Sequence, residues 1–137
     1  MILCSACLLG IECCYDGRSR LNLKAVDLAS RETLIPVCPE QLGGLPTPRS
    51  PSEIKEGRVF TKEGADVTAH FIRGAQEVLK IAGIYGITRA LMKQRSPSCG
   101  CGEIYDGTFT GRVITGNGVT AELLMKHGIN IITEDDF

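Results

Sequence analysis

The sequence lacks several features that would assign it to a specialised class of protein. Its net charge is −1 over 137 residues, so neither a basic excess nor a like-charge block indicates nucleic acid as a partner. No apolar run approaches the roughly 20 residues that cross a bilayer as a helix. The N-terminus is apolar, but no positively charged segment precedes it, which argues against a signal peptide. We therefore expect a cytoplasmic protein with one domain over residues 1–137 and no membrane partner.

Cysteine, by contrast, is abundant. The chain has seven cysteines, at positions 4, 7, 13, 14, 38, 99 and 101. A secreted disulfide scaffold usually has an even count and a signal peptide, so this odd count in a cytoplasmic chain indicates metal or redox chemistry. The alternative is that most of the cysteines are small buried hydrophobic residues. We favour that alternative for Cys4, which lies within an apolar run.

Short apolar runs alternate with helical patterns along the chain. The runs are typical of strands covered on both faces, and they lie at residues 1–6, 33–38, 87–93 and 129–134. The helical patterns lie at residues 22–30, 66–82 and 118–127. This alternation predicts an α/β fold, a single-domain three-layer sandwich with a mainly parallel, Rossmann-like sheet.

Local signals predict where several elements begin and end. Asp66 is a good N-cap for the longest helix, and Gly83 is predicted to end it. Residues 103–116 predict a small hairpin with an Asp-Gly turn. The proline-rich residues 46–58 are expected to form a surface loop within the domain.

Cysteines follow three of the predicted strands. Cys7 follows the first strand, Cys38 the second and Cys99 the third. Because the loops after the carboxyl ends of parallel strands gather at one edge of a sheet, we expect these thiols to converge. Glu40 shares the loop of Cys38, and Ser96 shares the loop of Cys99.

The spacing of these three cysteines does not match a zinc finger, which uses close pairs. Thiolates are the usual protein ligands of iron–sulfur clusters. A cluster held by only three thiols keeps one iron open, and that iron can act as a Lewis acid. His70 and His127 lie in helical patterns and are expected to be surface or capping residues, so a Cys/His catalytic dyad has little support.

Six motifs together make the chain resemble a known family. They are SACLLG, CCYDGR, PVCPEQLGGLPTPR, EGADVT, RSPSCG and IYDGTF, and the match runs from about residue 3 to about residue 134. They resemble a bacterial family, long described as a domain of unknown function, that includes the 2-thiouracil desulfidases.

The resemblance implies a small α/β domain that binds a 4Fe–4S cluster through Cys7, Cys38 and Cys99, with one iron open. It implies a substrate that is 2-thiouracil or a related thiolated pyrimidine, with uracil and hydrogen sulfide as products. In this interpretation Glu40 removes a proton from the water that attacks the thiocarbonyl carbon. Ser96 positions water or relays a proton to the ring.

Three further cysteines leave the ligand set open. Cys14 stands where the family's GxxCRYDG stretch has an arginine, and Cys13 precedes it as a competing ligand or a nearby thiol. Cys101 offers an alternative ligand to Cys99. A non-enzymatic module would use the same thiols for structural zinc, or to carry sulfur or iron. Such a closed site needs a fourth protein ligand, which Cys13 or Cys101 could supply. A thiol–disulfide protein ranks last.

Polar residues of the loops also have alternatives. Glu40 could be a turn carboxylate paired with Arg49 or Arg18, and Ser96 could be a turn residue. Arg49 and Arg95 are either substrate contacts or solvated loop residues. The near-neutral charge argues against tight nucleic-acid binding by this domain alone, and the expected oligomeric state is a monomer or homodimer.

Overall fold

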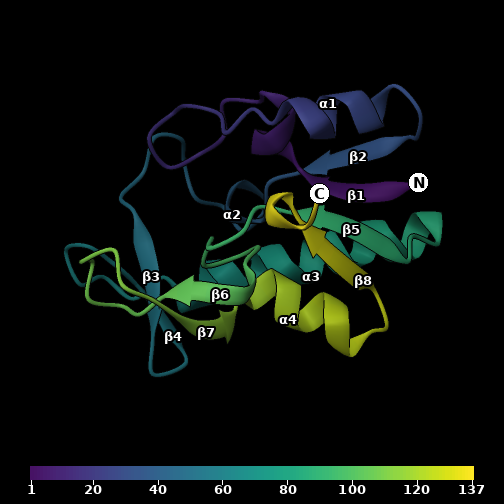
Figure 1. Ribbon diagram of the computed structural model, residues 1–137. Helices are drawn as coiled ribbons and strands as arrows, with labels where there is room; N and C mark the ends of the chain where they lie inside the picture. Colours follow the sequence, from purple (N-terminus) through teal and green to yellow (C-terminus); the bar gives the residue numbers. More distant parts are fainter.

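A four-stranded parallel sheet forms the centre of the computed structural model, which describes residues 1–137 (Figure 1). The strand order is β2-β1-β5-β8, and all three pairings are parallel. The strands are β1 (Ile2–Ser5), β2 (Leu34–Val37), β5 (Arg89–Met92) and β8 (Asn130–Thr133). All four predicted core strands are therefore present, and the α/β prediction is confirmed.

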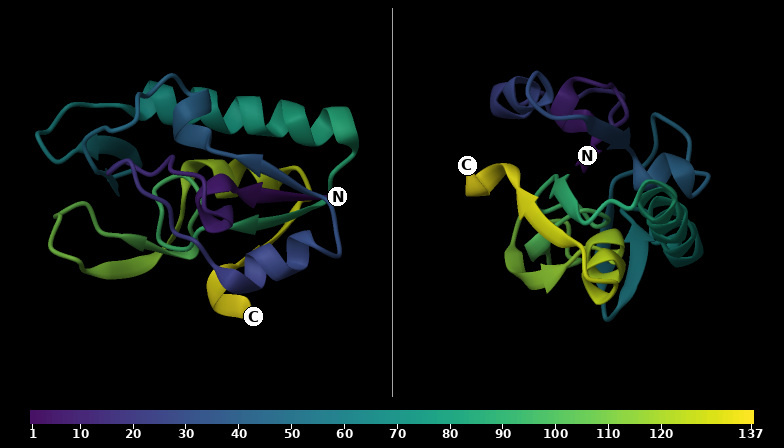
Figure 2. Two further views of the ribbon diagram at one scale, coloured as in Figure 1. Left: turned by 90° about the horizontal axis from the view of Figure 1, so that it is seen from above. Right: turned by 90° about the vertical axis from the view of Figure 1, so that its right-hand side faces the viewer.

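Helices cover both faces of the sheet and complete the three layers (Figure 2). One face carries the short 3-10 helix η1 (Ala6–Leu9) and α1 (Leu23–Ala29). The other face carries α3 (Thr68–Tyr85) and α4 (Val119–Lys126). The chain ends in a short 3-10 helix, η2 (Glu134–Asp136). None of the helices combines the length and the apolar character that crossing a membrane requires.

Successive side chains of β1 point to opposite faces of the sheet, so the strand contributes to the core on both sides. Leu3 packs on the side of α3 and α4, whereas Ile2 and Cys4 pack on the side of α1. Cys4 has no exposed surface, and burial raises the pKa of its thiol to about 12. Its interpretation as a small buried hydrophobic residue is confirmed.

Two hairpins extend the molecule beyond the carboxyl ends of the core strands (Figure 1). One consists of β3 (Ser52–Lys55) and β4 (Arg58–Thr61), and the other of β6 (Cys101–Tyr105) and β7 (Val113–Asn117). The second hairpin was predicted, but its connection runs over residues 106–112 and is longer than the predicted Asp-Gly turn. The first was expected to be a loop, which is wrong, because a two-residue turn at Glu56 and Gly57, both with positive φ, joins two short strands. The flanking prolines obscure this turn in the sequence.

The helix after Cys38 was not predicted. This helix, α2 (Pro39–Leu42), begins with Cys38 as its N-cap residue and packs on α3. Gly43 and Gly74 make the packing possible, since a Cβ at either position would overlap a backbone carbonyl of the facing helix segment. The close approach fixes α2, and with it Glu40, against the long helix.

Both predicted ends of the long helix are shifted. The helix continues through Gly83 and ends before Gly86, whose φ of 63° is the left-handed conformation typical of helix C-termini. Val67, not Asp66, occupies the N-cap position. Asp66 still accepts hydrogen bonds from the Thr68 N–H at 2.9 Å and the Thr68 hydroxyl at 2.6 Å, so it stabilises the first turn.

Removing the Asp66 carboxylate should make stability less dependent on acid pH. The Thr68 hydroxyl, the Thr68 N–H and Arg58 lower the pKa of Asp66 from its usual 3.8 to about 2. A lowered folded-state pKa contributes stability above the unfolded-state pKa, and this contribution is lost as pH falls from about 4 through about 2. Asp66→Ala should therefore lower Tm at neutral pH and lower it less near pH 2, measured by circular dichroism.

Asp27→Ala is the matched control, because Asp27 pairs only with Arg31 on the exposed face of α1. Exposed pairs of this kind contribute little, so its Tm should stay close to wild type across the range. An equal loss of Tm in Asp66→Ala at neutral and acid pH would contradict the role given to the Asp66 carboxylate.

Candidate functional site

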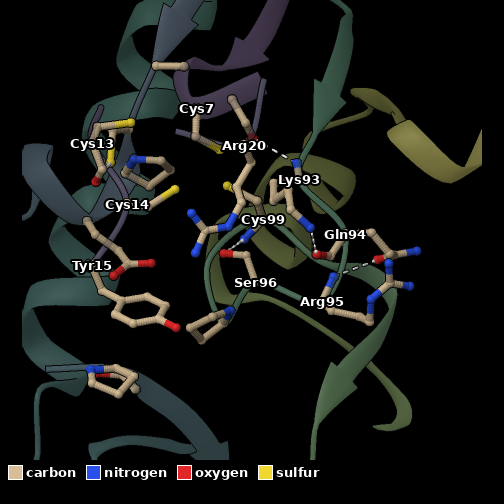
Figure 3. Close-up of a pocket in the computed structure, with 18 of the residues that line it drawn as sticks. Cys7, Cys13, Cys14, Tyr15, Arg20, Lys93, Gln94, Arg95, Ser96 and Cys99 are labelled. Carbon is tan, nitrogen blue, oxygen red and sulfur yellow. Dashed lines mark hydrogen bonds between the residues drawn. The ribbon is translucent and has the colours of Figure 1, made fainter. Parts of the chain in front are cut away.

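A cavity of about 260 Å³ opens at the carboxyl edge of the core sheet (Figure 3). Five cysteines line it: Cys7, Cys13, Cys14, Cys38 and Cys99. Glu40 and Ser96 line the same cavity. The predicted convergence of three strand-end loops is therefore present, and all five candidate residues named from the sequence lie together.

Cys7 enters the cavity from η1, directly after β1. Its carbonyl accepts hydrogen bonds from Gly10 N–H and Arg20 N–H, which fold the N-terminal loop back over it. Its thiol is buried and lies beside Cys14. Burial, and then the neighbouring Cys14 and Cys99, raise the pKa of Cys7, whereas Lys93 acts in the opposite direction.

Cys38 and Cys13 form a second pair of thiols. Cys38 ends β2 and begins α2, and its sulfur lies 3.7 Å from the Cys13 carbonyl oxygen. A hydrogen bond from the Cys13 thiol lowers the pKa of Cys38, with help from the Gln41 N–H and Arg49. The same hydrogen bond and burial raise the pKa of Cys13. Cys38 is therefore the thiol most disposed to become a thiolate.

Cys99 lies in a loop that the N-terminus of α4 holds in place. The N–H groups of Val119 and Thr120 donate to the carbonyls of Pro97 and Ser98, both at 2.9 Å. These first-turn N–H groups have no partner within the helix, so the loop satisfies them. Burial raises the pKa of Cys99 to about 12, although hydrogen bonds from Ser5 and Ser96 act in the opposite direction.

Ser96 also shapes the Cys99 loop. Its Oγ accepts hydrogen bonds from the N–H groups of Ser98 and Cys99, each at 3.1 Å. This is the turn role that the sequence left as an alternative. The same side chain also lines the cavity.

Glu40 is held by a largely buried arginine. Arg49 Nε donates to Glu40 Oε1 at 2.9 Å, and the two side chains are 6% and 16% exposed respectively. Arg49 Nη2 donates to the Cys13 carbonyl at 2.9 Å and lies 4.0 Å from the Cys38 sulfur. The sequence alternative of a Glu40–Arg49 pair is therefore present, whereas Arg18 takes no part in it. No protein group donates to Glu40 Oε2, which stays available at the cavity.

Several cavity residues were not found from the sequence. They are chiefly polar or aromatic: Tyr15, Arg20, Glu53, Lys93, Gln94 and Tyr105. Lys93 and Gln94 follow β5 directly, so the strand-end rule that found Cys99 could have found them. Glu53 and Tyr105 come from the two hairpins, whose position against the sheet no local pattern predicts. The cations of this group are paired: Arg20 with Asp16 at 3.1 Å, and Lys93 with Glu134 at 2.8 Å.

Arg95 was a candidate for substrate contact and is also paired. Its Nη1 lies 3.0 Å from Glu103 and 2.8 Å from Asp135, and both pairs are partly exposed. These pairs join the Cys99 loop to β6 and to η2. The structure thus gives Arg95 a role in holding the cavity wall.

Other candidate ligands lie away from the cavity. Cys101 begins β6 and approaches the Met125 sulfur at 3.9 Å, so its position does not support it as an alternative to Cys99. His70 contacts the Gly43 carbonyl and His127 contacts the Leu123 carbonyl. Cys4 and Cys7 have the C-x-x-C spacing of redox proteins, but both thiols are free and Cys4 belongs to the core.

The donor set of the cavity suits a cluster better than a single ion. Thiolates are the preferred ligands of iron–sulfur clusters, and five thiols face or border this space. No group of three or more His, Cys, Asp or Glu side chains converges closely enough to hold one metal ion. A cluster reaches thiols that lie farther apart, and its irons would offset the mutual repulsion of the thiolates.

The fold and the cavity together define a class, an α/β protein with a thiol-lined pocket at the carboxyl edge of its sheet. Comparison with known proteins then identifies the family. The model of the 2-thiouracil desulfurase family matches residues 2–136. The chain therefore belongs to the 2-thiouracil desulfurase family.

Two relatives agree with this membership. The uncharacterized protein YbbK of Bacillus subtilis (strain 168) is 42% identical, and the match covers 99% of this chain and 97% of that protein. The solved structure of the [4Fe-4S]-dependent thiouracil desulfidase TudS (DUF523Vcz) superposes with a TM-score of 0.93 at 45% identity. That match covers 99% of this chain and 91% of the TudS chain.

A Cβ at Gly118 should disturb the loop that carries Cys99. It would overlap the Ser98 carbonyl, although the φ of −64° at Gly118 suits alanine. Gly118→Ala should therefore lower the free energy of unfolding by about 1–3 kcal/mol through overpacking alone, measured by urea denaturation.

Gly83→Ala provides the opposite case within the same experiment. Gly83 lies inside α3, and a Cβ there would meet no atom within 4 Å. This substitution should raise stability by about 0.5–1 kcal/mol, because alanine loses less backbone entropy in a helix. A destabilisation of similar size in both variants would show that the Ser98 contact is not the cause.

Proposed function

We propose that this protein is a cytoplasmic 4Fe–4S-dependent enzyme that hydrolyses the thiocarbonyl of 2-thiouracil or a related thiolated pyrimidine. The products are uracil, or its analogue, and hydrogen sulfide. The observation that carries this proposal is the meeting of Cys7, Cys38 and Cys99 with Glu40 and Ser96 in one cavity. Family membership and the likeness to a [4Fe-4S]-dependent thiouracil desulfidase support the same function.

Cys7, Cys38 and Cys99 would hold the cluster, one from each strand-end loop. When bound by three thiolates, the cluster supplies an open, sulfur-binding iron with Lewis-acid character. The three loops are fixed by backbone hydrogen bonds within η1, α2 and the N-terminus of α4. The ligands are therefore in place before a cofactor arrives.

Glu40 is the general base in this proposal. Oε1 is fixed by Arg49, so Oε2 is presented to the cavity in one orientation. A water held there would lose its proton to Oε2 as its oxygen attacks the carbon that bears the sulfur. Arg49 is a positioning residue in this proposal, because it orients the carboxylate through this hydrogen bond.

Ser96 provides a hydroxyl on the opposite wall. Its lone pairs accept from the loop backbone, which leaves the O–H as a donor near Cys99. This group can donate to the pyrimidine ring or to the attacking water and so pass a proton. The turn fixes the orientation of the Ser96 side chain. Ser96 therefore has a structural role in the turn and a proposed catalytic role at the cavity.

The rival interpretation is a non-enzymatic module with a closed zinc site. No three His, Cys, Asp or Glu side chains converge closely enough to hold a single ion. Of the two alternative fourth ligands, Cys13 lines the cavity and Cys101 lies away from it. Seven free thiols also fit a reducing compartment. We further propose that residues 1–137 act as one iron–sulfur-binding domain, as a monomer or homodimer, on a small-molecule substrate and without tight nucleic-acid binding.

Each of the three proposed ligands should be required for the cluster. After anaerobic reconstitution, wild type should hold about four irons per chain, since a 4Fe–4S cluster contains four. Cys7→Ser, Cys38→Ser and Cys99→Ser should each lose the visible absorption of the cluster and the iron. Cys101→Ser is the control and should keep both. Colourless wild-type protein with one zinc per chain would overturn the proposal.

Glu40 should be required for turnover but not for the cluster. Glu40→Gln keeps an oxygen acceptor for Arg49 Nε, so the cavity should retain its shape. Loss of a general base typically costs 10²–10⁴-fold, so sulfide release from 2-thiouracil should fall by about that factor while the iron count stays unchanged. Glu77→Gln, on the exposed face of α3, should leave both unchanged. Full turnover in Glu40→Gln would contradict the assignment.

A further inference from the structure

Five thiols border the cavity, but the proposed cluster takes only three of them as ligands. The two that are left, Cys13 and Cys14, are neighbours in sequence and differ in environment. Any role they have depends on which of them faces the space that a cluster would fill.

Cys13 is held in place by its neighbours. The residue is 2% exposed, and its carbonyl oxygen lies 3.7 Å from the Cys38 sulfur. The same carbonyl accepts a hydrogen bond from Arg49 Nη2 at 2.9 Å. Cys13 is thus buried and held by its backbone next to Cys38.

Cys14 is placed differently. Its sulfur points into the same space as those of Cys7 and Cys99 (Figure 3). The side chain is partly exposed and lies beside Cys7, the proposed cluster ligand that follows β1.

The backbone around Cys14 forms a small turn that presents the thiol. Cys14 N–H donates to the Arg18 carbonyl at 3.1 Å, and Gly17 N–H donates to the Cys14 carbonyl at 2.8 Å. The turn is on the surface, and nothing lies within 4 Å of a Cβ built at Gly17. The turn therefore holds the Cys14 side chain at the cavity, where it also packs against the edge of the core cluster that contains Cys7.

Positive charge lies next to this turn. Arg20 also lines the cavity and is oriented by Asp16 at 3.1 Å and by the Tyr15 ring, whose centroid is 5.9 Å from its guanidinium carbon. A cluster with an additional thiolate carries an additional negative charge. Arg20 is placed to offset it.

We propose that Cys14 is an exchangeable fourth ligand of the cluster. Without substrate, the Cys14 thiol releases its proton to solvent and its sulfur binds the iron that the other three cysteines leave open. When the sulfur of a substrate arrives, the Cys14–iron bond breaks, the new iron–sulfur bond forms and Cys14 takes up a proton. No electron is transferred in this exchange. The inference rests on the proposed function, since it needs a cluster with one open iron.

The exchange has two consequences that can be measured separately. A capped iron is retained under oxidation, so the resting enzyme resists conversion to a 3Fe–4S cluster. The cap also competes with substrate, so it raises KM and leaves the ligands Cys7, Cys38 and Cys99 untouched. A purely structural role for Cys14 would produce neither effect.

The test compares wild type, Cys14→Ala and Cys14→Arg after anaerobic reconstitution, with circular dichroism as the check on folding. The arginine variant restores the residue type that the family's motif has at this position and, like alanine, has no thiol. Each protein is treated with ferricyanide, and the 3Fe–4S signal is followed by electron paramagnetic resonance. Both variants should lose the fourth iron about tenfold faster or more, and KM for 2-thiouracil should fall.

Two controls make the result specific. Cys101→Ala removes a thiol outside the cavity and should behave as wild type. Cys13→Ala removes the other spare thiol, and a faster loss of iron in it alone would overturn the assignment to Cys14. Equal rates of iron loss in wild type and both Cys14 variants, with turnover intact, would overturn this proposal alone. A wild-type protein that binds no four-iron cluster would overturn the proposed function as well.

Discussion

The buried guanidinium of Arg49 is the interaction on which the geometry of the site depends. It joins the Cys13 carbonyl, 36 positions away in sequence, to the Glu40 carboxylate and to the Pro46 carbonyl of its own loop. A charge that is 6% exposed is costly unless it is paired and fully hydrogen-bonded, and here it is both. Because all of these partners meet at one planar group, Cys38 and Glu40 cannot shift independently. The ion pair with Arg49 therefore orients the Glu40 carboxylate. Glu40 can be paired in this way and still act as the proposed general base.

Some of the cavity residues could be predicted from the sequence, because a local pattern of apolar strands and one rule of sheet topology were enough to find them. Cys7, Cys38 and Cys99 follow short apolar strands, and parallel strands bring their carboxyl ends to one edge. The β3–β4 hairpin was missed because its strands are short and prolines flank it. The end of α3 was placed too early because Gly83 resembles a helix terminus, whereas the left-handed residue is Gly86. Of the residues missed at the cavity, Glu53 and Tyr105 are brought to it by the hairpins through long-range packing.

Close backbone contacts position the loops that carry Cys38 and Cys99. Gly43 and Gly74 let α2 lie against α3, and Gly118 lets α4 begin against the Ser98 carbonyl. In each case a side chain is excluded by backbone from a distant part of the chain. Such a requirement has no signature in a single sequence, where these glycines are indistinguishable from turn residues. Several residues that line the cavity could therefore be named from the sequence, whereas the contacts that hold their loops were accessible only from the structure.

The arrangement of the thiols explains why the cavity suits a cluster that can change its coordination. Cys13 lies beside Cys38 and Cys14 beside Cys7, so two of the proposed ligands each have a neighbouring thiol. The first neighbour is buried and held by Arg49, and the second lies on a surface turn beside Arg20. In the proposed exchange, only the second of these thiols becomes a ligand. A closed and an open site would then differ in the ligation of one side chain, with no change in the sheet or in the three loops that end its strands.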